Sequence, residues 1–160
     1  MDEGLQRVFL DLENLARTGP GSDPEGYRMS EHQLVQMVLR NIEKTSPVDL
    51  INVLKNHPGS YNDISLFGAL SFLSHFIPSL PTPSLLSLLV VLCRHDSKFD
   101  GEKKQILNEL LGRVRIGKLT TVEIVELVGF LTPQTEEIAF ALGKLREGLL
   151  QEKENEKKQT

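Results

Sequence analysis

Hydrophobic and polar residues follow helical spacing along most of the chain, but one stretch departs from that pattern. Ile64–Cys93 contains no Asp, Glu, Lys or Arg. Pro78, Pro81 and Pro83 divide it, and because proline removes a backbone donor, one helix is expected to end near Ile77 and another to begin near Pro83. Two nearly uncharged helices joined at a proline-rich corner predict a buried helical hairpin, which the rest of the chain covers.

A membrane-spanning interpretation of this stretch competes with the buried one. A spanning helix needs roughly 20 consecutive apolar residues. The first half, Ile64–Ile77, and the second, Leu85–Cys93, are each shorter than this, and the prolines keep them from forming one helix. The sequence therefore predicts a core element and no membrane insertion.

An apolar stripe at helical spacing also marks the N-terminus. It predicts an amphipathic helix over residues 1–17, followed by a linker over residues 18–29, which are rich in Gly and Pro. The helix either packs on the chain's own core or docks on a partner, and the stripe does not separate these two outcomes. The docking face would consist of Leu5, Val8, Phe9 and Leu12.

The helices farther along the chain are bounded by local start and stop signals. Ser30 is expected to cap a helix with Leu34, Met37 and Val38 turned inward, and Gly117 to end the helix over residues 102–115. No convincing strand pattern is present. The expected helix starts are Ser30, Ser46-Pro47, Asn62 or Asp63, Pro83, Glu102, Thr120 or Thr121, and Thr132-Pro133.

Three of these helices share one spacing of apolar positions. Pro47-x-x-Leu50-x-x-Val53-Leu54 returns as Pro83-x-x-Leu86-x-x-Leu89-Val90 and as Thr121-x-x-Ile124-x-x-Leu127-Val128. A period of about 37 residues made of two helices is typical of an α-solenoid. An irregular helical bundle with chance spacings is the alternative. We expect an all-α fold: a short α-solenoid of about three helix-pair repeats over residues 30–150, with an N-terminal accessory helix and a charged tail over 151–160.

This two-helix period, with its Ser/Thr-(Pro)-x-x-Leu-x-x-Leu/Val openings, resembles the heptatricopeptide and octotricopeptide types of repeat, including the helical region of FAST-kinase-like proteins. The resemblance covers residues 45–150 and depends on apolar positions. The Trp and Leu-Gly/Tyr marks of tetratricopeptide repeats and the Thr-Pro-Leu-His motif of ankyrin repeats do not occur. The resemblance implies an organellar setting, with RNA or a ribonucleoprotein assembly as partner.

Composition narrows the function class. The chain has 160 residues, 39% of them hydrophobic, and a net charge of -4, which gives no overall attraction to nucleic acid or to anionic lipid. A single cysteine, Cys93, rules out an internal disulfide and a cysteine-rich metal site. The acidic start MDEGLQ lacks the basic region of a secretory signal, so an intracellular protein is expected.

Candidate motifs for chemistry are incomplete. Gly112–Lys118 matches the first seven positions of a phosphate loop, but it is preceded by a helix, and Leu119 occupies the position of the magnesium-binding Ser/Thr. Asp96–Gly101 begins like a calcium loop and lacks its bidentate Glu, and Cys93 with His95 supplies too few zinc ligands. We expect no enzyme activity, cofactor or metal.

The remaining titratable residues have structural interpretations. Cys93 is expected in the core, His75 in the core or a groove, and His32 and His57 on the surface.

One concentration of basic residues is the exception to the overall acidity. Phosphate binding needs several cations on one surface, and on a helix Arg113 and Arg115 point about 200° apart. A solvated helix face and an RNA-phosphate contact therefore both remain open. The residues concerned are Lys103, Lys104, Arg113, Arg115 and Lys118.

These observations predict a non-catalytic protein-protein interaction or scaffold subunit of a larger assembly. By resemblance, that assembly is an organellar ribonucleoprotein such as the mitochondrial ribosome; otherwise the protein is expected in the cytoplasm. The alternative is an RNA-binding helical-repeat protein. The expected partners are other protein subunits, with RNA as the partner in the alternative.

Overall fold

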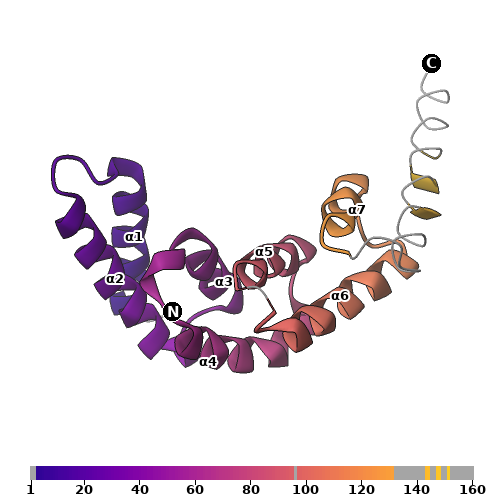
Figure 1. Ribbon diagram of the computed structural model, residues 1–160, viewed down its shortest axis with the longest axis horizontal. Coiled ribbons are helices and arrows are strands. Elements are labelled where there is room, and N and C mark those ends of the chain that lie inside the picture. Colours follow the sequence, from indigo (N-terminus) through magenta and orange to yellow (C-terminus); the bar gives the residue numbers. More distant parts are fainter. Residues whose placement is uncertain (1–2, 96, 132–142, 145–146, 149–150, 152–160) are drawn as a thin grey trace, which may run out of the picture. The chain divides into compact units, whose positions relative to one another are not determined.

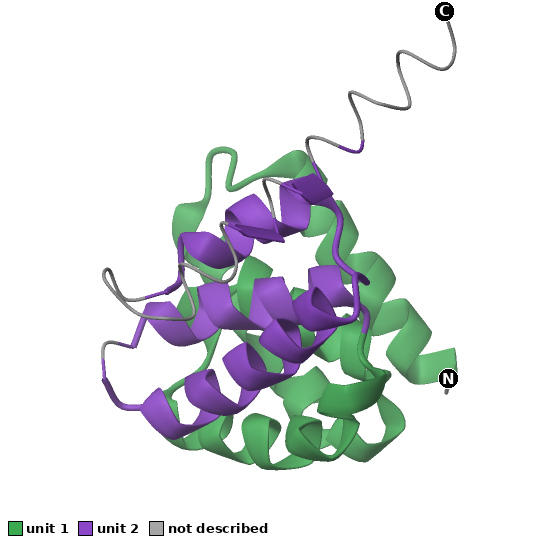
Figure 2. Ribbon diagram, turned by 90° about the vertical axis from the view of Figure 1, so that its right-hand side faces the viewer, with its two compact units in different colours: residues 1–80 green, residues 81–160 purple. Residues whose placement is uncertain are grey.

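The chain is all-helical wherever the structure describes it. The computed structural model describes residues 3–95, 97–131, 143–144, 147–148 and 151, and these residues include no strand (Figure 1). They form two compact units, which divide between Leu80 and Pro81 (Figure 2). None of the helices in this described part combines the length and the apolar character that crossing a bilayer requires. The all-α expectation is confirmed.

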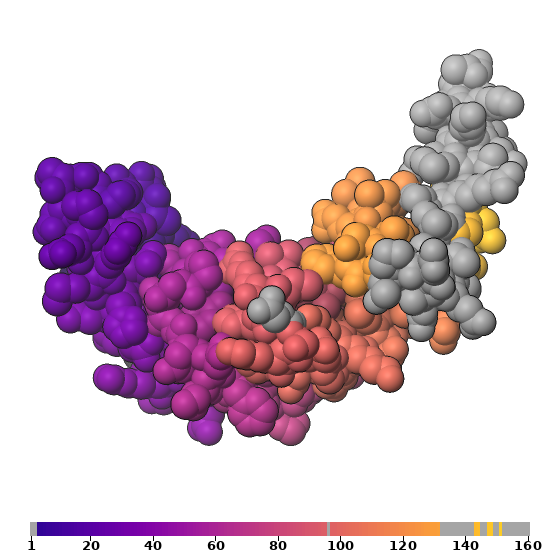
Figure 3. Space-filling model, viewed as in Figure 1, coloured from indigo at the N-terminus to yellow at the C-terminus, as the bar shows by residue number. Residues whose placement is uncertain are grey.

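Unit 1 begins with an antiparallel pair of helices, α1 (Glu3–Thr18) and α2 (Pro24–Arg40), which pack on each other. Gly19 and Gly21 have positive φ angles of 70° and 57°, which glycine adopts without steric cost, and they turn the chain between the helices. The surface of this pair is indigo in Figure 3. Leu5, Val8 and Leu12 of α1 are buried, and Phe9 is half-buried.

The start of α2 corrects the expected linker and cap. Asp23, and not Ser30, is the N-cap: its side chain accepts a hydrogen bond from the backbone N–H of Gly26, and Pro24 occupies the first turn. The residues expected to be linker after Asp23 are therefore the first turns of α2. The inward face is also rotated from the expected one, since Val35 and Val38 are buried whereas Met37 is exposed.

Short helices complete unit 1. They are a 3₁₀ turn η1 (Ile42–Lys44), α3 (Pro47–Asn56), a 3₁₀ turn η2 (Pro58–Ser60), α4 (Asp63–Leu73) and a 3₁₀ segment η3 (Ser74–Ser79). Ser46 caps α3 by accepting from the N–H of Asp49, as expected from the Ser-Pro start. Asn62 caps α4 by accepting from Ser65. The core of α3 consists of Leu50, Ile51, Val53 and Leu54.

The uncharged central stretch is only partly buried, and the boundary between the two units divides it. Its first half, α4 with η3, belongs to unit 1, and its second half, α5 (Thr82–Cys93), to unit 2. On α4, Leu66 and Leu73 are fully buried, but Ile64 and Phe67 are 82% and 58% exposed. The expectation of burial on all sides is wrong for α4, whereas eight of the twelve residues of α5 are buried.

Unit 2 is built by α5, α6 (Asp100–Arg115) and α7 (Thr121–Val128), with α6 and α7 both packed on α5. Gly117, with φ of 72°, follows the end of α6 as predicted. Thr120, one of the two residues expected as the cap, caps α7 in a capping box with Glu123. The helix expected from Thr132-Pro133 and the charged tail fall almost entirely outside the described residues.

Candidate functional site

The five basic residues singled out in the sequence do not form one open cationic surface. Lys103 lies 3.3 Å from the Asp100 carboxylate. The Arg113 side chain is only 12% exposed. Its Nε donates to Glu109 at 3.0 Å, and its Nη1 donates to the Thr82 hydroxyl, also at 3.0 Å. Arg113 therefore links α6 to the start of α5.

Lys104, Arg115 and Lys118 are exposed. Lys104 and Arg115 are eleven residues apart on α6, about 16 Å along the helix axis, so they cannot bind the same phosphate. The RNA contact predicted for the five residues remains a prediction, now limited to these three side chains.

The other sequence motifs do not form sites in the described residues. Gly112 lies inside α6, and the helix continues to Arg115, so no loop of backbone amides forms there. Among the side chains that the structure describes, no group of three or more His, Cys, Asp or Glu is placed to hold a metal ion. Cys93 is exposed at the end of α5, which corrects the expected core position.

The histidines differ in how they compare with expectation. His75 is exposed, which contradicts a core position but not the alternative of a groove, and His32 is exposed as expected. His57, expected on the surface, is 7% exposed. The spacing of residues in the sequence indicated this burial: positions 50, 53, 54 and 57 lie on one face of a helix, and the first three are buried in α3.

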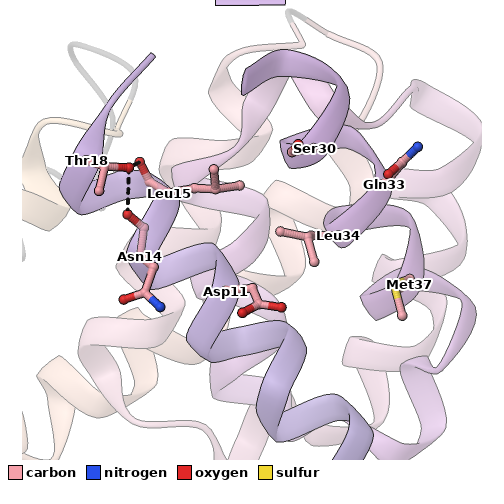
Figure 4. Close-up of a pocket in the computed structure, with 8 residues that line it drawn as sticks. All are labelled: Asp11, Asn14, Leu15, Thr18, Ser30, Gln33, Leu34 and Met37. Atoms are coloured by element: carbon pink, nitrogen blue, oxygen red, sulfur yellow. Dashed lines mark hydrogen bonds between the residues drawn. The ribbon is translucent and has the colours of Figure 1, made fainter. Parts of the chain in front are cut away.

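A groove runs along the α1–α2 pair (Figure 4). It has a volume of about 440 Å³ and is lined by four residues from each helix. Leu15 and Leu34 point toward each other across it, and Met37, 46% exposed, extends the apolar lining. The remaining lining is polar: Asp11, Asn14, Thr18, Ser30 and Gln33. We call this the α1–α2 groove; its mixed lining suits a protein segment with apolar and polar sides.

A second concave site, which we call the acidic cleft, lies between α1, α2 and α3. Its volume is about 400 Å³. Helix α1 supplies Phe9, Leu12, Glu13 and Ala16, and α2 supplies Tyr27 and Glu31. Helix α3 and the residue after it supply Asp49, Asn52, Val53, Asn56 and His57. Three carboxylates line this cleft, and none of its lining residues in the described part of the chain is Lys or Arg.

A hydrogen-bond network borders the acidic cleft. His57 Nδ1 lies 2.9 Å from one Glu31 oxygen, and the Ser60 hydroxyl donates to the other at 3.2 Å. Gln36 Nε2 donates to the Ser60 carbonyl at 2.7 Å. This network ties the end of α3 and the η2 turn to α2, across 26 residues of sequence.

The exposed side of α4, which we call the outer face of α4, is the other prominent feature of unit 1. Ile64 and Phe67 stand out from a helix that carries no charged residue after Asp63. Beside it lies a groove of about 320 Å³, lined by Gly68 and Ala69 on α4 and by residues of α2 and η1. By contrast, three residues of the N-terminal stripe, Leu5, Val8 and Leu12, are already buried, so they are not an open docking face.

Comparison with known proteins adds no relative to this picture. No protein-family model matches the chain, and neither a curated protein nor a solved structure matches it.

Proposed function

We propose that the protein is a non-catalytic interaction subunit that docks other proteins through exposed apolar helix surfaces. The observation that carries this proposal is the outer face of α4, where Ile64 and Phe67 are 82% and 58% exposed on a helix that carries no charged residue after Asp63. Exposed apolar side chains that lie close together on a surface are typical of protein interfaces.

The energy available at this face is enough to matter for binding. Fully burying a Phe or Ile side chain contributes about 1.5–3 kcal/mol, so covering what remains exposed of Ile64 and Phe67 would contribute about 1–2 kcal/mol each. Phe67 is the larger side chain, and the next residue, Gly68, places no side chain on the surface, with open space where its Cβ would be. The adjoining groove extends the surface that a partner would cover.

The helix-pair repeats expected from the sequence are part of the same proposal. Three helices begin at, or within one residue of, the starts Pro47, Pro83 and Thr121 of the repeated spacing: α3 at Pro47, α5 at Thr82 and α7 at Thr121. The matching positions Leu50, Leu86 and Ile124 are all buried, as are Val53, Leu89 and Leu127. We propose that these are equivalent helices of a short solenoid of helix pairs, which leaves surfaces such as the outer face of α4 for partners.

Native co-purification with identification of bound proteins tests the proposal. The wild-type chain should bring down a partner in stoichiometric amount, and the double substitution Ile64→Ser with Phe67→Ser should lose it. Leu10→Ser, which changes a residue 59% exposed on α1, is the matched control and should keep it. Recovery of the wild-type chain as a monomer alone, or retention of the partner by the double variant, would overturn the proposal.

Raising the salt concentration separates this function from RNA binding. An apolar interface should survive an increase from 50 to 200 mM salt, whereas binding through phosphates weakens steeply over that interval. If RNA co-purifies and is released over this interval, Lys104, Arg115 and Lys118 become the candidates for its binding. Placement in an organelle, implied by the resemblance alone, is tested by fractionating cells that express the tagged chain.

A further inference from the structure

The exposed residues of α4 form one continuous stripe. Ile64, Phe67, Gly68 and Ser71 are all exposed, and their i, i+3, i+4, i+7 spacing places them on a single face of the helix. Arg40 lines the groove of about 320 Å³ that lies beside this stripe. We propose that the outer face of α4 binds an α-helix of a partner protein, which presents an uncharged apolar stripe and, beside it, a carboxylate that pairs with Arg40.

The stripe changes from large to small side chains along α4. Its first half carries Ile64 and Phe67, and its second half carries Gly68 and Ser71. Gly68 also lines the groove, and a Cβ at this position would meet no atom within 4 Å. A helix that lies along the stripe therefore comes closest to the α4 backbone near Gly68, where a large side chain of the partner enters the groove. Small side chains of the partner then lie against Ile64 and Phe67.

The backbone of α4 favours a helical partner over an extended one. Within α4 the backbone N–H and C=O groups bond to each other along the helix, so the stripe offers no row of free donors and acceptors like that of a strand edge. An extended partner segment would bury its own backbone groups on this face without partners, which costs free energy. A partner helix satisfies its backbone internally and buries only side chains.

The stripe itself calls for apolar contacts. The Ser71 hydroxyl donates to the Phe67 carbonyl at 3.0 Å, so an apolar side chain can cover it without breaking a hydrogen bond. A charged side chain placed over Ile64 or Phe67 would lose water, and α4 carries no opposite charge after Asp63 to compensate. The part of the partner helix that covers the stripe is therefore uncharged.

Arg40 sets the charge expected beside the stripe. It is the last residue of α2 and is exposed, and its side chain makes no hydrogen bond or ion pair with any residue that the structure describes. None of the other described lining residues of the groove is charged. A partner that covers the groove takes water away from this guanidinium, and a carboxylate of the partner offsets that loss by accepting from its N–H groups. A cation at the same place would be repelled.

The inference rests on the proposed function for the use of α4, and its test uses a defined probe. A displayed library of single-helix peptides, in which the positions of one face vary among Ala, Leu, Phe, Glu and Lys, is selected on the full chain. The selected peptides should combine large and small apolar residues in one stripe and carry Glu, not Lys, beside it. A selection that yields no binder, or that enriches Lys as often as Glu, would overturn the inference.

Matched glycine variants locate the binding of one selected peptide, measured by isothermal titration calorimetry. Gly68→Leu fills the open space beside α4 and should weaken binding by about tenfold or more, because the partner helix can no longer come close. Gly101→Leu is the control, since Gly101 is also an exposed helical glycine with open space at its Cβ, and it should leave binding unchanged. Circular dichroism checks that both variants keep their helices. Equal binding by the two variants contradicts the inference.

A charge exchange tests the pairing with Arg40. Arg40→Glu should weaken the Glu-bearing peptide by about tenfold or more. The same peptide with Lys in place of that Glu should bind the Arg40→Glu variant better than it binds the wild-type chain. If both peptides respond alike to the substitution, Arg40 takes no part in binding, and the charge assigned to the partner is wrong.

Sedimentation of the chain alone tests whether a second copy covers this face. A dimer that forms with rising concentration and is lost in Gly68→Leu would take the place of the partner helix and refute the inference. Failure of the proposed function appears differently: the selected peptides bind as expected, but no protein co-purifies with the chain. If a protein co-purifies through Ile64 and Phe67 and no peptide of this kind binds, only the inference fails.

Discussion

Removing the Glu31 carboxylate tests the network that holds α2 to the end of α3. Glu31 is 20% exposed and accepts two hydrogen bonds, from the nearly buried His57 and from Ser60. A hydrogen bond to a charged group contributes about 1.5–3 kcal/mol to stability, and a neutral donor that loses its acceptor costs at least about 1 kcal/mol. Because Glu31→Ala removes the acceptor of both hydrogen bonds, it should lower the free energy of unfolding by about 3 kcal/mol. Glu31→Gln keeps one acceptor oxygen, so it should cost about 1 kcal/mol.

The measurement is urea unfolding followed by circular dichroism, combined with hydrogen exchange of the α2 and α3 amides to place the loss in unit 1. Glu43→Ala, at an exposed position on η1, is the control and should change the free energy of unfolding by less than about 0.5 kcal/mol. If Glu31→Ala costs no more than Glu43→Ala, or if the Ala and Gln variants are equal, the network does not stabilise the fold as reasoned.

Four further substitutions test the packing, a cap, a turn and an interhelical contact, each by the same urea unfolding measurement. Leu88→Ala, at a fully buried position of α5, should cost about 3 kcal/mol, and a cost below about 1 kcal/mol would contradict its core position. Thr120→Ala removes the capping box of α7 and should cost about 1 kcal/mol. Gly117→Ala should also cost about 1 kcal/mol, entirely from the positive φ, because a Cβ there meets no atom within 4 Å. Arg113→Met should cost about 1 kcal/mol by releasing its two partners, whereas Lys104→Met should be nearly neutral.

Local signals in the sequence were sufficient for most helix ends. Ser46-Pro47 and Thr120 with Glu123 act through backbone groups three residues away, so their capping follows from the sequence alone. Asp23-Pro24-Glu25 carries the same kind of signal. It was missed because the surrounding glycines and prolines gave the segment the composition of a linker.

Features that depend on contacts between distant residues could not be predicted. Helix α4 is apolar on every side, so its sequence has no polar stripe to show that Ile64 and Phe67 face outward. Glu31 and His57 are 26 residues apart, and only the packing of α2 on α3 brings them together. The acidic cleft needs three helices, and single-helix periodicity does not show which faces meet.

The uncharged outer face of α4 has a consequence for the abundance of the protein in cells. A copy without its partner displays Ile64 and Phe67 on a helix that carries no charged residue after Asp63, and exposed apolar surface of this kind is what chaperones and proteases recognise. Unassembled copies would then be cleared faster than assembled ones. The steady-state amount of this chain would follow the supply of whatever covers α4, so that synthesis in excess would not lead to accumulation.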